Sequence, residues 1–320
     1  MELRKLGYSD LTLSTIGLGT WAMGGGDWKF GWGPQNDDAS TAAIHQALDE
    51  GINWIDTAAI YGHGRSEEVV GRAIKGIRDS VIIATKCGRV WEGDSREIGK
   101  SLTAKSIRGE VEASLKRLAI DVIDLYQIHW PEPDEEIEEG WSTMAALVKE
   151  GKVRYVGVSN FSLEQLKRAQ AIHPITSLQP PYSMLRREIE EEVMGYCETN
   201  QIGIIAYSPM QAGLLSGGFT KQRADNLPES DWRGRHPFFN EPLLSRHLGI
   251  VDQLGEIAKA KNCSLAQLAL AWVLRFPVMT SAIVGARSPE QISETSKAGT
   301  IRLTQTEIDQ IEGILSFGNS

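Results

Sequence analysis

The sequence predicts an α/β protein whose eight parallel strands close into a (β/α)8 barrel, the architecture also called a TIM barrel. Eight short runs of aliphatic and β-branched residues occur along the chain, and each is followed by a signal for the start of a helix. The runs are continuously apolar rather than alternating, which is typical of parallel strands covered on both faces. Because no change in composition marks a linker, we expect one barrel domain over residues 1–320 rather than two doubly wound domains.

The expected strands are residues 16–19, 54–57, 81–85, 122–128, 153–158, 177–179, 203–206 and 282–284. Several of the helices between and after them are indicated by a capping box, in which Ser or Thr is followed three residues later by Glu or Gln. These patterns begin at Ser162, Ser264, Ser288 and Thr304. Pro289 would take the first helical position, where its missing N–H group costs no hydrogen bond.

Two segments depart from a minimal barrel. Residues 3–13 look like a hairpin that could close the bottom of the barrel. Residues 211–249 show little periodicity and are rich in Gly, Pro and Arg. A loop of this length inside a compact domain is usually functional, so we expect it to take part in binding.

The composition excludes several classes of function. Lys and Arg number 33 against 42 Asp and Glu, a net charge of −9, so general binding to nucleic acid or to an anionic membrane is disfavoured. Three scattered cysteines fit neither a disulfide framework nor a zinc site, and none of the six histidines has metal-ligand spacing, so no metal is expected. The N-terminus lacks the apolar run of a signal peptide. We expect a cytoplasmic protein, and the sequence leaves its oligomeric state open.

Four titratable side chains follow three successive predicted strands. Asp56 ends the second strand and Tyr61 lies in the loop after it, while Lys86 and His129 end the third and fourth. Active sites of such barrels lie at the carboxyl ends of the strands. Singly, each residue has an ordinary structural alternative, such as a loop cap, a solvated tip or a satisfied polar group. Together, on one rim, they favour a catalytic site.

The four residue types suit the protonation of an oxygen atom while a hydride reaches the neighbouring carbon. A tyrosine phenol has a pKa of about 10, and a nearby lysine ammonium is expected to lower that pKa. Asp56 beside Lys86 would hold the ammonium charged, and His129 could orient a carbonyl oxygen by a hydrogen bond. The group offers no activated serine or cysteine nucleophile.

Four segments resemble the signatures of the aldo-keto reductase family in order and spacing. They are residues 51–62 (GINWIDTAAIYG), 84–86 (ATK), 121–131 (DVIDLYQIHWP) and 151–161 (GKVRYVGVSNF). The resemblance covers residues 3 to about 299, and within the family it is greatest to bacterial general-stress reductases and potassium-channel β subunits. It implies NADPH-dependent reduction of aldehydes or ketones to alcohols. By this resemblance Tyr61 is the general acid, Asp56 and Lys86 tune it, and His129 orients the substrate.

A phosphate site is expected after the eighth strand. Gly285, Arg287 and Ser288 lead into a helix N-terminus, which attracts anions, and the Arg287 fork suits a phosphate monoester; the alternative is a surface arginine beside an ordinary cap. The resemblance assigns Arg287 to the 2′-phosphate of NADP, Gln291 to the ribose phosphate and Glu294 to the adenine amine, and so favours NADP over NAD. The G-x-G-x-x-A match at residues 17–22 is rejected as a Rossmann fingerprint, because three glycines follow where a helix should begin.

The resemblance also implies the remaining cofactor contacts. Asp56 is included in this set, and Tyr207 would stack on the nicotinamide ring, whereas Ser159, Asn160 and Gln179 would bind its carboxamide. The other residues implied near the cofactor are Thr20 and Trp21, and, in the loop that would clamp the pyrophosphate, Ser208, Pro209, Met210, Gly213 and Leu215. Gly218 and Thr295 depart from the family, which usually has a basic residue and Asn there. Arg233 could supply the missing charge.

The predicted loops after the strands contain several tryptophans. Tryptophans in loops after strands could form an apolar substrate pocket, namely Trp21, Trp28, Trp32, Trp91 and Trp130, while Trp54 and Trp272 are expected in the core.

A Schiff-base lyase using Lys86 is a second hypothesis for the function, although Asp56 would keep that amine protonated. A third is an NADP-binding regulatory subunit with little turnover, although such relatives tend to have Asn in place of His129.

Overall fold

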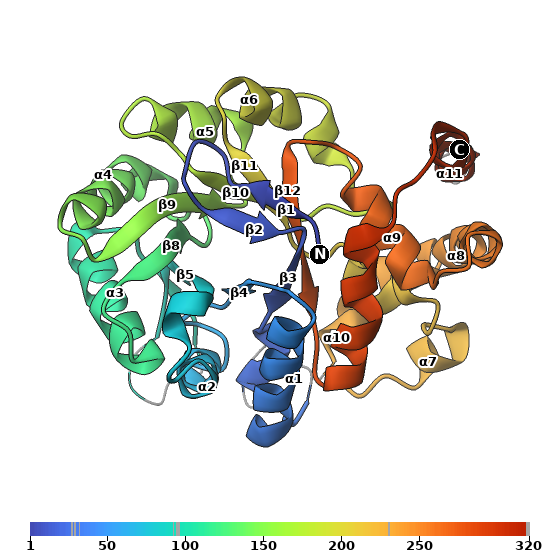
Figure 1. The fold of residues 1–320 in the computed structure, drawn as a ribbon, viewed down its shortest axis with the longest axis horizontal. Coiled ribbons are helices and arrows are strands. Elements are labelled where there is room, and N and C mark those ends of the chain that lie inside the picture. The colour runs from blue at the N-terminus through green and yellow to red at the C-terminus, as the bar shows by residue number, and fades with distance from the viewer. Residues whose placement is uncertain are drawn as a thin grey trace.

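The computed structural model describes residues 1–317 except 27, 29, 32, 92, 94–96 and 230. In this part of the chain, eight parallel strands hydrogen-bond into a closed barrel in the order β10-β11-β12-β3-β4-β5-β8-β9 (Figure 1). The barrel strands are β3 (Ile16–Gly19), β4 (Trp54–Asp56), β5 (Ile82–Cys87), β8 (Ile123–Ile128), β9 (Val153–Ser159), β10 (Ser177–Gln179), β11 (Gly203–Ala206) and β12 (Met279–Gly285). The predicted TIM barrel is therefore confirmed.

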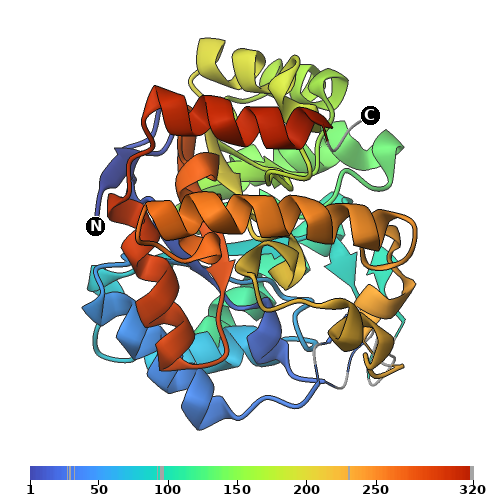
Figure 2. The same ribbon diagram turned by 90° about the vertical axis from the view of Figure 1, so that its right-hand side faces the viewer.

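Helices surround the barrel on its outer side (Figures 1 and 2). They are α1 (Asp37–Asp49), α2 (Arg65–Ala73), α3 (Ala104–Leu118), α4 (Ile137–Lys149), α5 (Leu163–Gln170), α6 (Val193–Thr199), α7 (Lys221–Asp225), α8 (Leu243–Ala260), α9 (Leu265–Val273), α10 (Pro289–Thr295) and α11 (Gln305–Phe317). Short 3-10 helices are η1 (Trp21–Gly24), η2 (Arg78–Ser80), η3 (Asp134–Glu136), η4 (Glu188–Glu190), η5 (Gln211–Ser216), η6 (Trp232–Arg235), η7 (Pro237–Phe239) and η8 (Ser296–Thr300). Figure 2 shows α11 running beside α8, against which it packs.

The differences from the predicted elements have local causes. Strand β12 begins at Met279, three residues before the predicted strand. The polar Ser281 can lie buried in it because its hydroxyl donates to the Ser14 carbonyl at 2.7 Å. The segment predicted as a loop over 211–249 is only partly irregular: it carries η5, α7, η6 and η7, and α8 begins at Leu243. A short antiparallel pair, β6 (Arg89–Val90) and β7 (Gly99–Lys100), was not predicted from the sequence.

The predicted capping boxes form at three of four helices. Both reciprocal hydrogen bonds are present at Ser162, at Ser264 and between Thr304 and Glu307. At α10, Ser288 is the N-cap but makes no capping bond. There the Gln291 side chain accepts instead from the backbone N–H of Arg287 at 2.8 Å, one residue before the N-cap. The α10 N-terminus is thus tied to Arg287 rather than closed on itself.

The N-terminal hairpin, β1 (Leu3–Lys5) paired with β2 (Thr12–Ser14), closes the amino end of the barrel. Its residues Leu6, Leu11 and Leu13 are buried in a cluster with side chains of the barrel interior, namely Trp54, Ala84, Leu125, Ile205 and Ile283. The Asn53 amide joins the hairpin to β4, accepting from Ser14 N at 2.8 Å and donating to Thr12 O at 2.8 Å. The polar residues of the interior are therefore left at the opposite, carboxyl end.

Trp54 fills the barrel interior above the hairpin, and Trp272 is buried in the core outside the barrel, as predicted. The Trp54 indole N–H donates to Ser14 O at 3.2 Å and to Ser281 Oγ at 3.1 Å. Gly17 of β3 faces this indole so closely that an added Cβ would lie 2.1 Å from a Trp54 ring carbon.

Among the described residues, no helix combines the length and apolar composition needed to cross a membrane.

We expect Gly17→Ala to lower the free energy of unfolding by about 2–3 kcal/mol, because the new methyl group must displace the Trp54 ring in a close-packed barrel. Gly109→Ala is the matched control: Gly109 lies inside α3 and its added Cβ would meet no atom within 4 Å. That control should stabilise the protein by about 0.5–1 kcal/mol through helix propensity. Urea denaturation measures both changes, and equal stability of the two variants would contradict the packing assigned to Gly17.

Candidate active site

Lys86 lies at the carboxyl end of β5 with its side chain fully buried. Its ammonium group donates to Asp56 Oδ2 at 2.8 Å, to the Thr57 carbonyl at 2.9 Å and to the Tyr61 hydroxyl at 3.2 Å. These three acceptors match the three donors of an ammonium group. Asp56 ends β4, and Tyr61 lies in the loop between β4 and α2, so consecutive β/α units build this arrangement.

A hydrogen-bond network extends from Asp56 across the barrel mouth. Asp56 Oδ1 accepts from the Gln179 amide at 2.8 Å, and the Gln179 carbonyl accepts from the Ser159 hydroxyl at 2.8 Å. The Asn160 amide donates to Ser159 Oγ and to the His129 carbonyl, both at 3.0 Å, and accepts from the Tyr207 hydroxyl at 2.9 Å. Residues predicted from distant motifs are therefore brought together on one rim.

Burial changes the proton affinity of the groups that line this rim. Loss of hydration raises the pKa of Tyr61 well above 10, and the Asp56 carboxylate raises it further. The expectation that Lys86 would lower this pKa is therefore wrong. Lys86 is ion-paired with Asp56, and the effect of burial on the pKa of Tyr61 is larger than the effect of the lysine charge. Burial also lowers the pKa of His129 well below 6.5, helped by the positive charges of Lys86 and Arg89. Tyr61 therefore keeps its proton at neutral pH, and His129 is a neutral imidazole.

Aromatic rings form a wall around the Tyr61 ring. Trp21 stacks on the Tyr61 ring with centroids 6.3 Å apart, Trp28 lies tilted against it at 6.0 Å, and His129 meets it edge-on at 5.8 Å. Trp232, which was not predicted, stacks on Trp21 at 6.2 Å. Its only sequence signal was its place in the long segment after β11.

Of the other tryptophans predicted for the pocket, two lie elsewhere on the rim and one is outside the described residues. Trp130 is 38% exposed, and the Arg89 guanidinium lies 5.5 Å from its ring centroid. Trp91 packs edge-on against His63 at 5.4 Å rather than against Tyr61. Trp32 lies outside the described residues.

The loop after β11 has an unusual backbone. Ser208, Gln211 and Ala212 have positive φ angles of 53°, 46° and 51°, followed by Gly213 at 93°. Non-glycine residues rarely adopt this conformation, and such strain is concentrated at binding sites. The N–H groups of Gly213 and Leu215 both donate to the Met210 carbonyl at 3.1 Å, which closes a tight turn. Pro209 is buried beside it.

Arg233 holds this loop together instead of presenting a free charge. Its guanidinium forms an ion pair with Asp231 at 2.6 Å and donates to the Ala212 carbonyl at 3.3 Å. The side chain of Arg233 is 9% exposed and that of Asp231 11%. The charge that Arg233 was expected to supply is therefore balanced by Asp231 within the loop.

The residues expected around the adenine half of a dinucleotide lie near the N-terminus of α10. Arg287 follows β12 and reaches across to the connection between β3 and α1, where its Nε donates to Gln35 Oε1 at 2.7 Å. Gly285 and Glu294 are exposed beside it. Gln35 was not predicted, since a glutamine in a Gly-rich loop carries no sequence signal.

Thr20, another residue expected near the cofactor, lies beside Asp56. It is buried, and its hydroxyl donates to the Asp56 carbonyl at 3.1 Å.

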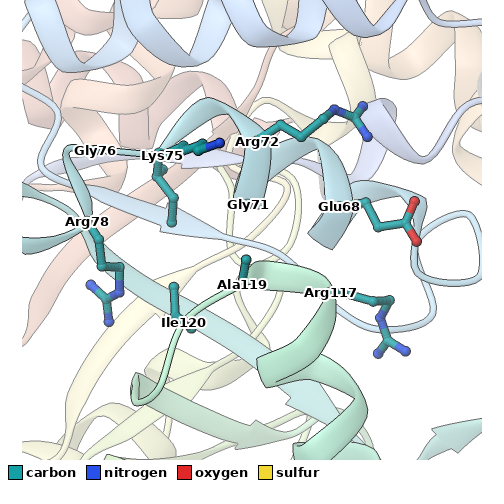
Figure 3. A pocket seen from close by; sticks show the side chains of 10 residues that line it. Glu68, Gly71, Arg72, Lys75, Gly76, Arg78, Arg117, Ala119 and Ile120 are labelled. Atoms are coloured by element: carbon teal, nitrogen blue, oxygen red, sulfur yellow. The ribbon is translucent and has the colours of Figure 1, made fainter.

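A groove of about 490 Å³ lies between α2 and α3, away from this rim (Figure 3). Arg72, Arg78 and Arg117 line it, but each is ion-paired, with Asp37, Asp124 and Glu67 respectively, at 2.6–2.7 Å. The groove lies where α2 and α3 end and the chain returns to the amino ends of the strands, so it is separate from the Tyr61 site.

In the part of the chain that the structure describes, no group of three His, Cys, Asp or Glu residues could hold a metal ion.

The chain is similar in sequence and in structure to known proteins. A model of the aldo/keto reductase family matches residues 15–316. The aldo-keto reductase YhdN of Bacillus subtilis is 40% identical over 98% of this chain and 94% of its own length, and the NADH-specific methylglyoxal reductase of Escherichia coli is 36% identical over 96% of both. The solved structure of glycerol dehydrogenase AKR11B4 from Gluconobacter oxydans superposes with a TM-score of 0.90 at 37% identity, covering 99% of this chain and 95% of that one.

The fold and the match together define an oxidoreductase barrel. The chain belongs to the aldo/keto reductase family, as the four sequence segments indicated. Strand β3 is followed by the 3-10 helix η1 rather than by an α-helix, which agrees with rejecting a Rossmann fingerprint there.

Glu110 of α3 supports the turn directly after Lys86. Its carboxylate accepts from the backbone N–H of Gly88 at 2.8 Å and from the Ser106 hydroxyl at 2.9 Å. Burial raises the pKa of Glu110 from 4.5 to about 7, opposed by those two hydrogen bonds and by Arg117. The folded protein thus binds a proton at this site more tightly than the unfolded chain does.

The free energy of unfolding should therefore fall as the pH rises from about 4.5 to about 7, by up to roughly 3 kcal/mol from this residue. We expect Glu110→Gln, which keeps an acceptor for Gly88 but cannot ionise, to remove that loss. Urea unfolding of both proteins at pH 5, 6, 7 and 8 tests this. A parallel pH dependence in the two proteins would contradict the role given to Glu110.

Proposed function

We propose that the protein reduces aldehydes or ketones to alcohols with a nicotinamide dinucleotide, NADPH in preference to NADH. The observation that carries the proposal is the 3.2 Å contact between the Lys86 ammonium and the Tyr61 hydroxyl, with Asp56 at 2.8 Å on the lysine. A proton donor and a fixed positive charge thereby meet at one point on the rim.

The residues at the mouth suit a dinucleotide chemically. Ser159, Asn160 and Gln179 present the hydroxyl and amide groups that a carboxamide would bind, and the Tyr207 ring lies among them. The strained turn at 208–213 and the Arg287 side chain would serve the phosphates. The dinucleotide, when bound, supplies the hydride that reaches the carbonyl carbon.

The protein's own residues would complete the reaction at oxygen. His129, held neutral, can donate a hydrogen bond to the substrate carbonyl oxygen and orient it towards Tyr61. Tyr61 then passes its proton to that oxygen as negative charge develops there. Lys86 stabilises the phenolate that is left behind, because its ammonium already contacts the same hydroxyl. Asp56 keeps the ammonium charged and in place.

The alternative functions have less support. A Schiff-base lyase needs a free amine at Lys86, but all three protons of this ammonium group have acceptors, one of them a carboxylate. A regulatory subunit with little turnover would not need His129 and Tyr61 facing each other. Neither alternative explains the whole rim.

The aromatic wall and the named relatives indicate which carbonyl compounds should be tested as substrates. Trp21 and Trp28 favour a carbonyl compound with an apolar or aromatic body. Two relatives are named a methylglyoxal reductase and a glycerol dehydrogenase, which adds small oxygenated compounds to the panel. Because the first of these is NADH-specific, both reduced cofactors belong in every assay.

We expect Tyr61→Phe to lower kcat for carbonyl reduction by at least about 100-fold, because the proton donor is lost. The dissociation constant for NADP⁺, measured by quenching of tryptophan fluorescence, should stay unchanged. Tyr155→Phe is the control, since Tyr155 bonds to Asp10 at the hairpin end of the barrel and should keep full activity. Full turnover by Tyr61→Phe, followed by absorbance of the reduced cofactor, would show that the proton comes from another group.

A further inference from the structure

Gln35 ties the connection between β3 and α1 to Arg287. Its Oε1 accepts from Arg287 Nε at 2.7 Å, and its Nε2 donates to the Arg287 carbonyl at 3.1 Å. Arg287 Nη2 also donates to the carbonyl of Pro34. The two segments are 252 residues apart in sequence, so the link exists only in the folded barrel.

These bonds use one particular edge of the guanidinium. Nε and Nη2 form one of the two edges through which arginine binds an oxyanion with two parallel hydrogen bonds. Here both nitrogens of that edge donate to neutral oxygens of the protein, those of Gln35 and Pro34. A phosphate that approached this edge would have to displace both oxygens.

Two further hydrogen bonds hold Gln35 itself in position. Its Nε2 also donates to Ser40 Oγ at 3.1 Å, at the start of α1. Its backbone carbonyl accepts from Arg65 Nη2 at 2.8 Å, and Arg65 is ion-paired with Asp37 at 2.7 Å. The acceptor offered to Arg287 is therefore preorganised by α1 and α2 and does not depend on a freely rotating side chain.

We propose that Gln35 is a specificity-determining residue for the dinucleotide, because it competes with the 2′-phosphate of NADP for the guanidinium of Arg287. The inference rests on the proposed function. NAD has no 2′-phosphate and leaves the Gln35–Arg287 link intact, whereas a 2′-phosphate that binds the Nε and Nη2 edge of Arg287 must break that link. Gln35 consequently reduces the preference of the native protein for NADP over NAD.

The test uses two substitutions of opposite expected effect. Gln35→Leu removes the acceptor at similar size, so the dissociation constant for NADP⁺ should fall about tenfold while that for NAD⁺ stays unchanged. Gln35→Glu places a carboxylate beside Arg287 and should raise the NADP⁺ constant about tenfold, since it binds the guanidinium more tightly and repels the phosphate. Quenching of tryptophan fluorescence by NADP⁺ and NAD⁺ measures both dissociation constants for each protein, the native one included, without turnover.

Gln46→Leu is the matched control. Gln46 also lies on the α1 side and also bonds across to α10, at Ser293 Oγ, 3.1 Å away, but it does not contact Arg287. This variant should leave both dissociation constants unchanged. In an Arg287→Leu background the effect of Gln35→Leu should disappear, because no guanidinium remains to compete for.

The outcomes separate this inference from the proposed function. If Gln35→Leu weakens NADP⁺ binding, or leaves it unchanged in a protein that binds both dinucleotides, Gln35 does not compete and the inference is overturned while the proposed function stands. If the native protein binds neither NADP⁺ nor NAD⁺, the proposed function fails, and the inference fails with it.

Discussion

The buried ion pair between Lys86 and Asp56 is the constraint on which the rest of the site depends. A buried ammonium is very costly unless oxygen atoms replace its lost hydration. Asp56, Thr57 and Tyr61 supply these oxygens at 2.8, 2.9 and 3.2 Å. This requirement places the end of β4 and the loop after it over the end of β5. Removing any one acceptor would leave an N–H of the buried ammonium group without a partner, and removing Asp56 would also leave its charge uncompensated.

The same ion pair organises the neighbouring strands. Asp56 has a second carboxylate oxygen, which accepts from Gln179 of β10, and the network continues through Ser159 and Asn160 to Tyr207. The barrel interior beneath is closed by Trp54 and by the leucines of the N-terminal hairpin. Because apolar packing fills the amino end, the buried polar groups of the rim lie at the carboxyl end, where the loops can bring a ligand to them.

Secondary structure was largely predictable here because most barrel strands contain a short run of apolar residues. Strand β12 shows where this signal fails, since Thr280 and Ser281 are polar and yet buried, and Ser281 is held in the interior by the hydrogen bonds of its hydroxyl. The cap at Ser288 failed for a related reason: Gln291 found a partner in the Arg287 backbone. The pKa of Tyr61 moved opposite to expectation, because sequence shows the neighbours of a group but not how far it is removed from water.

The sequence by itself determined the alternation of strands and helices, the family, and the residue types at the strand ends, because these depend on local patterning and on motifs that are contiguous in the chain. Only the tertiary structure decided which side chains meet. Trp232 stacks on Trp21 and Gln35 binds Arg287 through contacts across 211 and 252 residues of chain, respectively. Contacts of that kind arise when barrel closure brings loops from different strands together, and residues so far apart leave no periodicity or spacing in the sequence from which the contact could be predicted.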